Sequence, residues 1–155
     1  MFTCTKNILS PQDGIIITLH EVPDDLFSDK ILGDGFAIIP HDNKVFSPVN
    51  GEIFQIAETK HAFYIKSEDG LDILIHMGID TVNLKGKGFD CNVKVGQKVK
   101  VGDLLATEDF NVMREGGFSC HTIFVITNMK IVKEVEVHEG EAKKLETVAL
   151  SYDLV

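Results

Sequence analysis

Two short apolar runs meet at a turn in the stretch Ala62-Phe-Tyr-Ile-Lys-Ser-Glu-Asp-Gly-Leu-Asp-Ile-Leu-Ile-His-Met77. Asp69-Gly70 is a strong hairpin signal, because both residue types tolerate the positive φ that a tight turn between antiparallel strands requires. Turn residues recur in this way along the chain, where many of the 13 glycines flank β-branched runs of strand length. Further runs of this type are Gly35–Ile39, Gly51–Ala57, Leu104–Glu108 and Thr122–Thr127. The sequence therefore predicts an all-β fold.

Helical signals are few and short. Phe110–Glu115 is a candidate short helix, and Pro23 suits the first turn of a helical segment that includes Asp24. The chain of 155 residues contains no linker, low-complexity segment or tandem repeat. We therefore expect residues 1–155 to form one domain, an antiparallel β-sandwich or barrel-sandwich hybrid with short helical turns.

Composition narrows the class of protein. Hydrophobic residues make up 44% and charged residues 25% of the chain, as in soluble globular proteins. The net charge of −9 argues against nucleic acid as a partner. Neither a membrane-spanning run nor a signal peptide is visible, so a cytoplasmic location is expected. Cys4, Cys91 and Cys120 are too widely spaced to suggest a disulfide framework or a cysteine zinc site.

Two histidines fall where the predicted hairpin can bring them together. With a two-residue turn, His76 faces Phe63 across the hairpin, and His61 is its diagonal neighbour on the same face. With a three-residue loop, His61 points to the opposite face unless a bulge restores it. An adjacent pair could bind a metal ion, relay protons or carry a phosphoryl group. The spacing leaves these readings open, together with that of two unrelated histidines.

A longer segment around His76 carries a resemblance. Gly70-Leu-Asp-Ile-Leu-Ile-His-Met-Gly-Ile-Asp-Thr-Val82 resembles the phosphorylation-site signature of the glucose-family IIA components of the bacterial phosphoenolpyruvate-dependent sugar phosphotransferase system. Five other blocks resemble the family in the same order, and the resemblance extends from about Val22 to Gly140. These blocks are Gly33–Pro40, Ser47–Gly51, Glu58–Phe63, Leu84–Phe89 and Thr127–Met129.

The resemblance implies a fold, a function and a catalytic set. It implies a β-sandwich with both histidines on neighbouring strands, and a phosphoryl carrier that needs no cofactor. His76 would accept phosphate from phospho-HPr and pass it to the IIB domain of a glucose-type membrane permease during sugar uptake. His61 would contact the phosphate without being phosphorylated itself, and Thr59 would hydrogen-bond and orient His61. Such a carrier is expected to be a cytoplasmic monomer that docks transiently at the permease.

The resemblance also implies a partner surface. Asp24 and Asp80 would meet basic side chains of HPr, and backbone N–H groups near Gly78 and Ile79 are expected to donate to the phosphate. No resident metal is expected, although zinc bridged by a partner at His61 and His76 is compatible with the family. An exposed apolar ring around the site would dock HPr and IIB, and it comprises Leu26, Phe27, Ile31, Leu32, Leu74 and Val82.

Two rival readings remain at this point. The first is a lipoyl or biotinyl carrier modified on Lys130. Two segments resemble such a carrier, namely Val93–Leu105, with turns at Gly96 and Gly102, and Asn128-Met129-Lys130. Those carriers are about half this length, and the reading leaves the His76 signature unexplained. A zinc hydrolase would need a third ligand and a general base, which the sequence does not offer. The sequence identifies neither the sugar nor regulatory partners, and Ser119–Thr122 and the tail after Gly140 depart from the family pattern.

Overall fold

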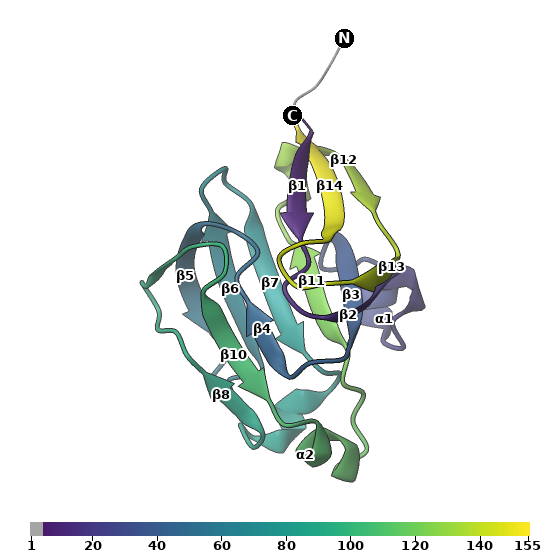
Figure 1. The fold of residues 1–155 in the computed structure, drawn as a ribbon, viewed down its shortest axis with the longest axis vertical. Coiled ribbons are helices and arrows are strands. Elements are labelled where there is room, and N and C mark those ends of the chain that lie inside the picture. The colour runs from purple at the N-terminus through teal and green to yellow at the C-terminus, as the bar shows by residue number, and fades with distance from the viewer. Residues whose placement is uncertain (1–4) are drawn as a thin grey trace.

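The computed structural model describes residues 5–155, so Cys4 lies outside the described residues (Figure 1). The strands are β1 (Lys6–Leu9), β2 (Gly14–Thr18), β3 (Asp34–Pro40), β4 (Lys44–Phe46), β5 (Gly51–Ile56), β6 (Ala62–Ser67), β7 (Asp72–Met77), β8 (Phe89–Cys91), β9 (Lys98–Val99), β10 (Leu104–Glu108), β11 (Thr122–Ile126), β12 (Val132–Val137), β13 (Gly140–Ala142) and β14 (Val148–Leu154). The helical segments are η1 (Leu19–Glu21), α1 (Asp25–Ser28), η2 (Thr81–Leu84), α2 (Phe110–Glu115) and η3 (Met129–Ile131).

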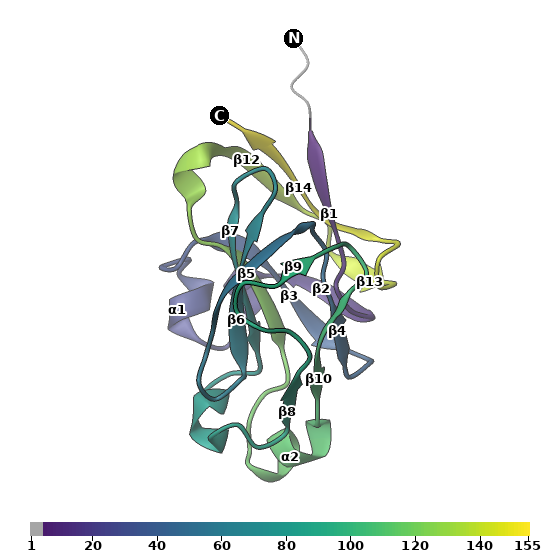
Figure 2. The same ribbon diagram turned by 90° about the vertical axis from the view of Figure 1, so that its left-hand side faces the viewer.

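Within residues 5–155 the strands form one large and two small sheets. The large sheet has eight strands in the order β13-β2-β3-β11-β7-β6-β5-β9, and the small sheets are β1-β14-β12 and β4-β10-β8. The strand pairs are antiparallel, and the large sheet lies between α1 on one side and β4 and β10 on the other (Figure 2). The prediction of an all-β antiparallel sandwich with short helical turns is confirmed.

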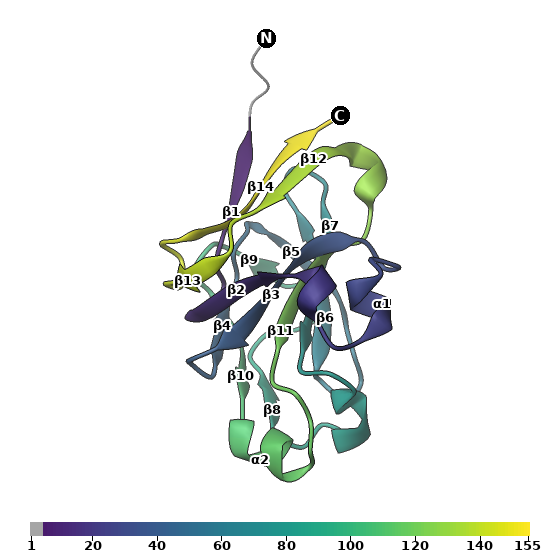
Figure 3. The ribbon, with the colours of Figure 1, turned by 90° about the vertical axis from the view of Figure 1, so that its right-hand side faces the viewer.

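The pleat of β7 decides which face carries the candidate site. Ile73, Ile75 and Met77 point into the main core between the sheets, whereas Leu74 belongs to a second cluster on the outer face. Because side chains alternate along a strand, His76 shares the outer face with Leu74. The segments η1 and α1 pack over this outer face (Figure 3).

The register of the β6–β7 hairpin differs from the two-residue turn considered above. Ala62 pairs with His76 and Lys66 with Asp72, so residues 68–70 form the three-residue loop that was the second alternative, and His76 faces Ala62 instead of Phe63. One local and one tertiary contact hold the longer loop, because the Asp69 carboxylate accepts hydrogen bonds from Ser67 and from Tyr152 of β14. Asp69 is thereby held out of a tight two-residue turn.

No helix within residues 5–155 is long and apolar enough to cross a membrane.

The expected short helix at α2 is present, and the Asp109 side chain caps it by accepting from the Asn111 and Val112 amides. Gly96 and Gly102 adopt the positive φ predicted for their turns, at 89° and 98°. The tail after Gly140 forms β13 and β14, and β14 pairs with both β1 and β12.

Candidate active site

The rings of His61 and His76 lie against each other despite the register. Their centroids are 4.9 Å apart and their planes make an angle of 79°. His61 precedes β6 at a bend, directly after Lys60 with a φ of 60°. Because His61 lies outside the regular strand, the pleat does not direct its side chain to the opposite face. The contact expected between the two histidines is therefore present, for a reason other than the diagonal pairing.

The hydrogen bond at His76 fixes its tautomer. Nδ1 of His76 lies 2.7 Å from the carbonyl oxygen of Gly78. A carbonyl oxygen only accepts hydrogen bonds, so Nδ1 carries the proton and donates it. The lone pair of a neutral His76 ring is then on Nε2.

His61 has its own oxygen partner. Its Nδ1 lies 2.6 Å from Oγ1 of Thr59, which is the contact predicted for Thr59. A hydroxyl can donate or accept, so this bond is compatible with either neutral tautomer of His61. Thr59 nevertheless fixes the orientation of the ring, which is 8% exposed.

Burial keeps both imidazoles neutral. Burial, with a smaller contribution from the neighbouring His61, lowers the pKa of His76 from 6.5 to about 4. The hydrogen bond to Gly78 and the carboxylates of Asp24 and Asp80 act in the opposite direction but do not offset it. Burial also lowers the pKa of His61. At neutral pH the pair therefore presents a lone pair and no positive charge.

The turn after His76 uses the amides that were expected to bind phosphate. The N–H of Gly78 donates to His121 O (2.7 Å) and the N–H of Ile79 to Ser119 O (3.1 Å). Both N–H groups are therefore paired with backbone oxygens, and donation to a phosphate by groups near Gly78 and Ile79 stays a prediction. Their acceptors come from the segment before β11, far away in sequence, so the local pattern carried no signal of them.

The rim of the site is acidic and partly apolar. Asp24 caps α1 by accepting from the Leu26 amide at 2.9 Å, and Asp80 is exposed, with a φ of 59°. Both carboxylates favour the protonated form of His76. Four members of the expected apolar ring are exposed by 38–65%, namely Leu26, Ile31, Leu32 and Val82.

The expected exposure is wrong for the other two members of that ring. Phe27 is 4% and Leu74 is 3% exposed, because both lie in the cluster between α1 and the outer face of the sheet. The Phe27 ring also packs edge-on against His76, with centroids 5.3 Å apart.

The described residues offer no complete metal site. Among residues 5–155, no group of three or more His, Cys, Asp or Glu side chains could hold a metal ion. Both Nδ1 atoms of the pair already have oxygen partners, which leaves one Nε2 on each ring as a ligand. The zinc hydrolase reading is therefore not supported.

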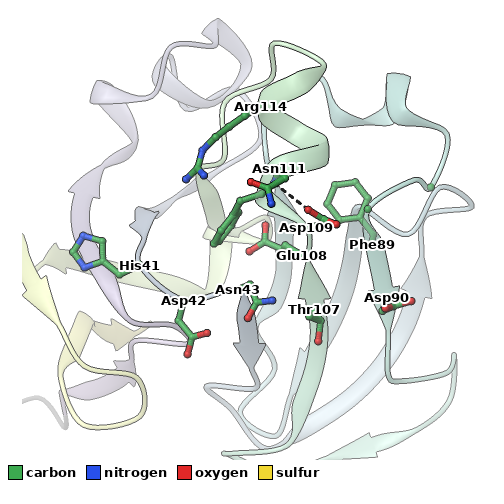
Figure 4. A pocket seen from close by; sticks show the side chains of 13 residues that line it. His41, Asp42, Asn43, Phe89, Asp90, Thr107, Glu108, Asp109, Asn111 and Arg114 are labelled. Atoms are coloured by element: carbon green, nitrogen blue, oxygen red, sulfur yellow. Dashed lines mark hydrogen bonds between the residues drawn. The ribbon is translucent and has the colours of Figure 1, made fainter.

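A cavity of about 770 Å³, lined mostly by polar residues, lies apart from the histidine pair (Figure 4). It lies among β8, β10 and α2, and Glu108 is among the residues that line it. This carboxyl group is 1% exposed and was not predicted as a functional residue. Other lining residues are His41, Asp42, Asn43, Asn111 and Arg114.

The fold and the pair define a class: a β-sandwich domain whose site holds two neighbouring neutral imidazoles. A sequence model described as phosphoenolpyruvate-dependent sugar phosphotransferase system, EIIA 1, matches residues 6–132. The chain belongs to this family, and its role is that of a phosphocarrier. The lipoyl or biotinyl alternative is not supported. Lys130 lies in η3, and the Asn128 side chain of that motif instead binds the backbone of Gly70 and Asp72.

Individual relatives agree with the family. The chain is 44% identical over 144 residues to a "PTS system glucose-specific EIIA component" of Buchnera aphidicola, covering 93% of this chain and 89% of that protein. It is 40% identical over 150 residues to a "PTS system glucose-specific EIICBA component" of Streptococcus pneumoniae, covering 97% of this chain but only 21% of that longer protein. The solved structure of glucose permease IIA from Mycoplasma capricolum matches with a TM-score of 0.86 and 39% identity, over 97% of both chains.

Proposed function

We propose that this chain accepts a phosphoryl group from phospho-HPr on Nε2 of His76 and passes it to the IIB domain of a glucose-type membrane permease. The observation that carries this proposal is the hydrogen bond from His76 Nδ1 to the Gly78 carbonyl. It reserves the lone pair of Nε2 for attack on phosphorus, on a ring whose lowered pKa keeps it neutral.

The proposed step balances without a proton leaving the site. The Nε2 lone pair of His76 forms a bond to phosphorus while the nitrogen–phosphorus bond of the donor phosphohistidine breaks. The released electron pair returns to the donor imidazole, and the proton on Nδ1 of His76 stays on Nδ1, hydrogen-bonded to the Gly78 carbonyl. One nitrogen–phosphorus bond replaces another, so positioning and charge stabilisation provide most of the catalysis.

His61 and Thr59 have a supporting role in this proposal. If the Thr59 hydroxyl donates to His61 Nδ1, the Nε2 of His61 carries a proton and can donate it to a phosphoryl oxygen. The contact of the two rings at 4.9 Å supports this arrangement. Loss of the His61 imidazole would slow the onward transfer more than the acceptance.

The rim supplies the proposed docking surface for HPr and IIB. Leu26, Ile31, Leu32 and Val82 expose apolar area beside the site, and exposed apolar patches commonly mark interfaces. Asp24 and Asp80, together with the net charge of −9, favour partners with a basic surface. The Streptococcus pneumoniae relative is described as an EIICBA component, which supports a membrane permease as the recipient.

We propose no resident cofactor for this reaction. The two free Nε2 atoms of His61 and His76 supply only two of the four ligands of a tetrahedral zinc ion. Zinc binding at this site would therefore require ligands from a docked partner. The proposed place of action is the cytoplasmic face of the membrane, where a permease and HPr meet; further regulatory targets would use the same rim.

Phosphoryl transfer in a reconstituted system tests the proposal. The full chain is incubated with enzyme I, HPr and labelled phosphoenolpyruvate, and transfer to a IIB domain is followed separately. His76→Ala is expected to take no label, and His61→Gln to accept label but pass it on slowly. His41→Ala removes an exposed histidine away from the pair and should behave as wild type. Full labelling of His76→Ala would end the assignment.

A further inference from the structure

Thr81 is a buried residue next to the histidine pair that the mechanism above does not use. It is the first residue of η2, and its side chain is 0% exposed. Its hydroxyl donates to the carbonyl oxygen of Met77 at 2.5 Å. Met77 is the last residue of β7 and lies between His76 and Gly78, so this bond acts on the backbone that carries the acceptor histidine.

The Thr81 hydroxyl takes the place of a missing strand bond. The N–H of Met77 donates to the carbonyl oxygen of His61 at 2.7 Å. In a regular antiparallel pair, the N–H of His61 would return a bond to the Met77 carbonyl. The backbone bonds within residues 5–155 do not include this return bond. Because Thr81 satisfies the Met77 carbonyl instead, His61 can leave the ladder and turn its ring toward His76.

The methyl group of Thr81 packs on the other end of the same peptide. A Cβ atom placed on Gly78 would lie only 2.4 Å from Thr81 Cγ2 and 3.0 Å from Ser119 O. Gly78 has a φ of 77°, and its carbonyl oxygen is the acceptor of the His76 Nδ1 proton. The hydroxyl and the methyl of Thr81 thus hold the two ends of the Met77–Gly78 peptide.

We infer that Thr81 is a positioning residue, which fixes the Gly78 carbonyl for His76 Nδ1 and keeps His61 out of the β6–β7 ladder. This inference rests on the proposed function for its kinetic consequence only. Without the hydroxyl, the buried Met77 carbonyl lacks a partner unless the His61 amide moves back to it. Either change displaces an imidazole, and loss of the Gly78 acceptor allows the His76 proton to move to Nε2, where it blocks the attacking lone pair.

Three variants separate this role from a general effect on packing. Thr81→Val keeps the shape and removes the hydroxyl, whereas Thr81→Ser keeps the hydroxyl and removes the methyl. Thr127→Val is the matched control, because the Thr127 hydroxyl donates to the carbonyl of Asp72 at the opposite end of β7. Thr127→Val therefore removes a hydroxyl bond to the same strand, away from the histidines, at a carbonyl that keeps the Thr127 N–H as a donor.

The first readout is the tautomer of His76, taken from imidazole ¹⁵N shifts of the unphosphorylated protein. Wild type, Thr81→Ser and Thr127→Val should carry the proton on Nδ1, whereas Thr81→Val should show a population with the proton on Nε2. The second readout is the rate of phosphoryl transfer from phospho-HPr, which Thr81→Val should lower by about 10- to 100-fold, as for small misplacements of reacting groups. Thr127→Val should leave this rate unchanged.

The two readouts fail independently of each other. A folded Thr81→Val protein with the Nδ1 tautomer and the wild-type rate would overturn the positioning role, as would an equal loss in Thr127→Val. If Thr81→Val changes the His76 tautomer but the wild-type protein accepts no phosphate from phospho-HPr, the positioning role stands and the proposed function is rejected. If Thr81→Val does not fold, Thr81→Ala carries the same expectation, because it removes the hydroxyl without placing a second methyl against the Met77 carbonyl.

Discussion

Replacing Glu108 with glutamine is expected to stabilise the protein at neutral pH. Glu108 ends β10 and is 1% exposed. Its Oε2 accepts from Gln12 Nε2 at 2.9 Å and from the Thr122 hydroxyl at 3.5 Å, while Oε1 has no partner among the described residues. Burial, opposed by these two hydrogen bonds, raises the pKa of Glu108 from 4.5 to about 8. The folded protein therefore holds this carboxyl group in its neutral form at pH 7.

The direction and size of the effect follow from linkage. A raised acid pKa gives a contribution to stability that is complete below the unfolded pKa of 4.5 and is lost as the pH rises through about 8. Each pH unit in this window lowers the free energy of unfolding by about 1.4 kcal/mol. The loss accumulated between pH 4.5 and pH 7 is about 3 kcal/mol. Glu108→Gln removes this dependence and keeps an acceptor for Gln12. Since the new amide also needs hydrogen-bond partners, the expected net gain at pH 7 is about 1–3 kcal/mol.

Urea unfolding across the range from about pH 5 to pH 8 measures the difference. The gain of Glu108→Gln over wild type should be near zero at the acid end and should grow with pH. The titration of His76 affects both proteins equally and cancels in the difference. Glu115→Gln, at an exposed position of α2, is the matched control and should show no such growth. Parallel curves for wild type and Glu108→Gln over the whole range would refute the reasoning.

Three further predictions concern the histidine pair and the residues around it. The lowered pKa of His76 means that its share of the folding free energy is present above about pH 6.5 and is lost as the pH falls toward about 4; NMR titration should show a neutral His76 ring down to about pH 5. Phe27→Ala should destabilise the fold by about 3 kcal/mol, whereas Leu26→Ala should leave thermal stability unchanged and weaken HPr binding; equal unfolding temperatures for the two variants would contradict this split. Gly78→Ala places a Cβ 2.4 Å from Thr81 Cγ2 at a positive φ. We therefore expect the free energy of unfolding to fall by about 2 kcal/mol and His76 to lose its Nδ1 tautomer. An unchanged imidazole ¹⁵N spectrum would count against this prediction.

Several strands were predictable because their signals are local. The strands at Leu104–Glu108 and Thr122–Ile126 follow from β-branched runs bounded by turn residues, and the short helix at Phe110–Glu115 was also expected. The hairpin register was not predictable from Asp69-Gly70. The Asp69 carboxylate is bound by Tyr152 of a strand far away in sequence, and this contact outweighs the local turn preference.

The site divides in the same way between local and distant causes. His76, His61 and Thr59 were predicted through the resemblance, and the structure brings these three side chains together. The burial of Phe27 and Leu74 depends on how α1 packs against the sheet, which no local pattern contains. The involvement of Gly78 and Ile79 in backbone bonds, and the position of Thr81 behind them, likewise depend on the approach of residues 119–121 and β6.

The most direct test of the account is to locate the phosphate by NMR on the phosphorylated, ¹⁵N-histidine-labelled protein. The account predicts a coupling between phosphorus and the Nε2 of His76, while His76 Nδ1 keeps its proton and donates it in a hydrogen bond to the Gly78 carbonyl. A coupling to Nδ1 of His76, or phosphate on His61 or any other histidine, would contradict it.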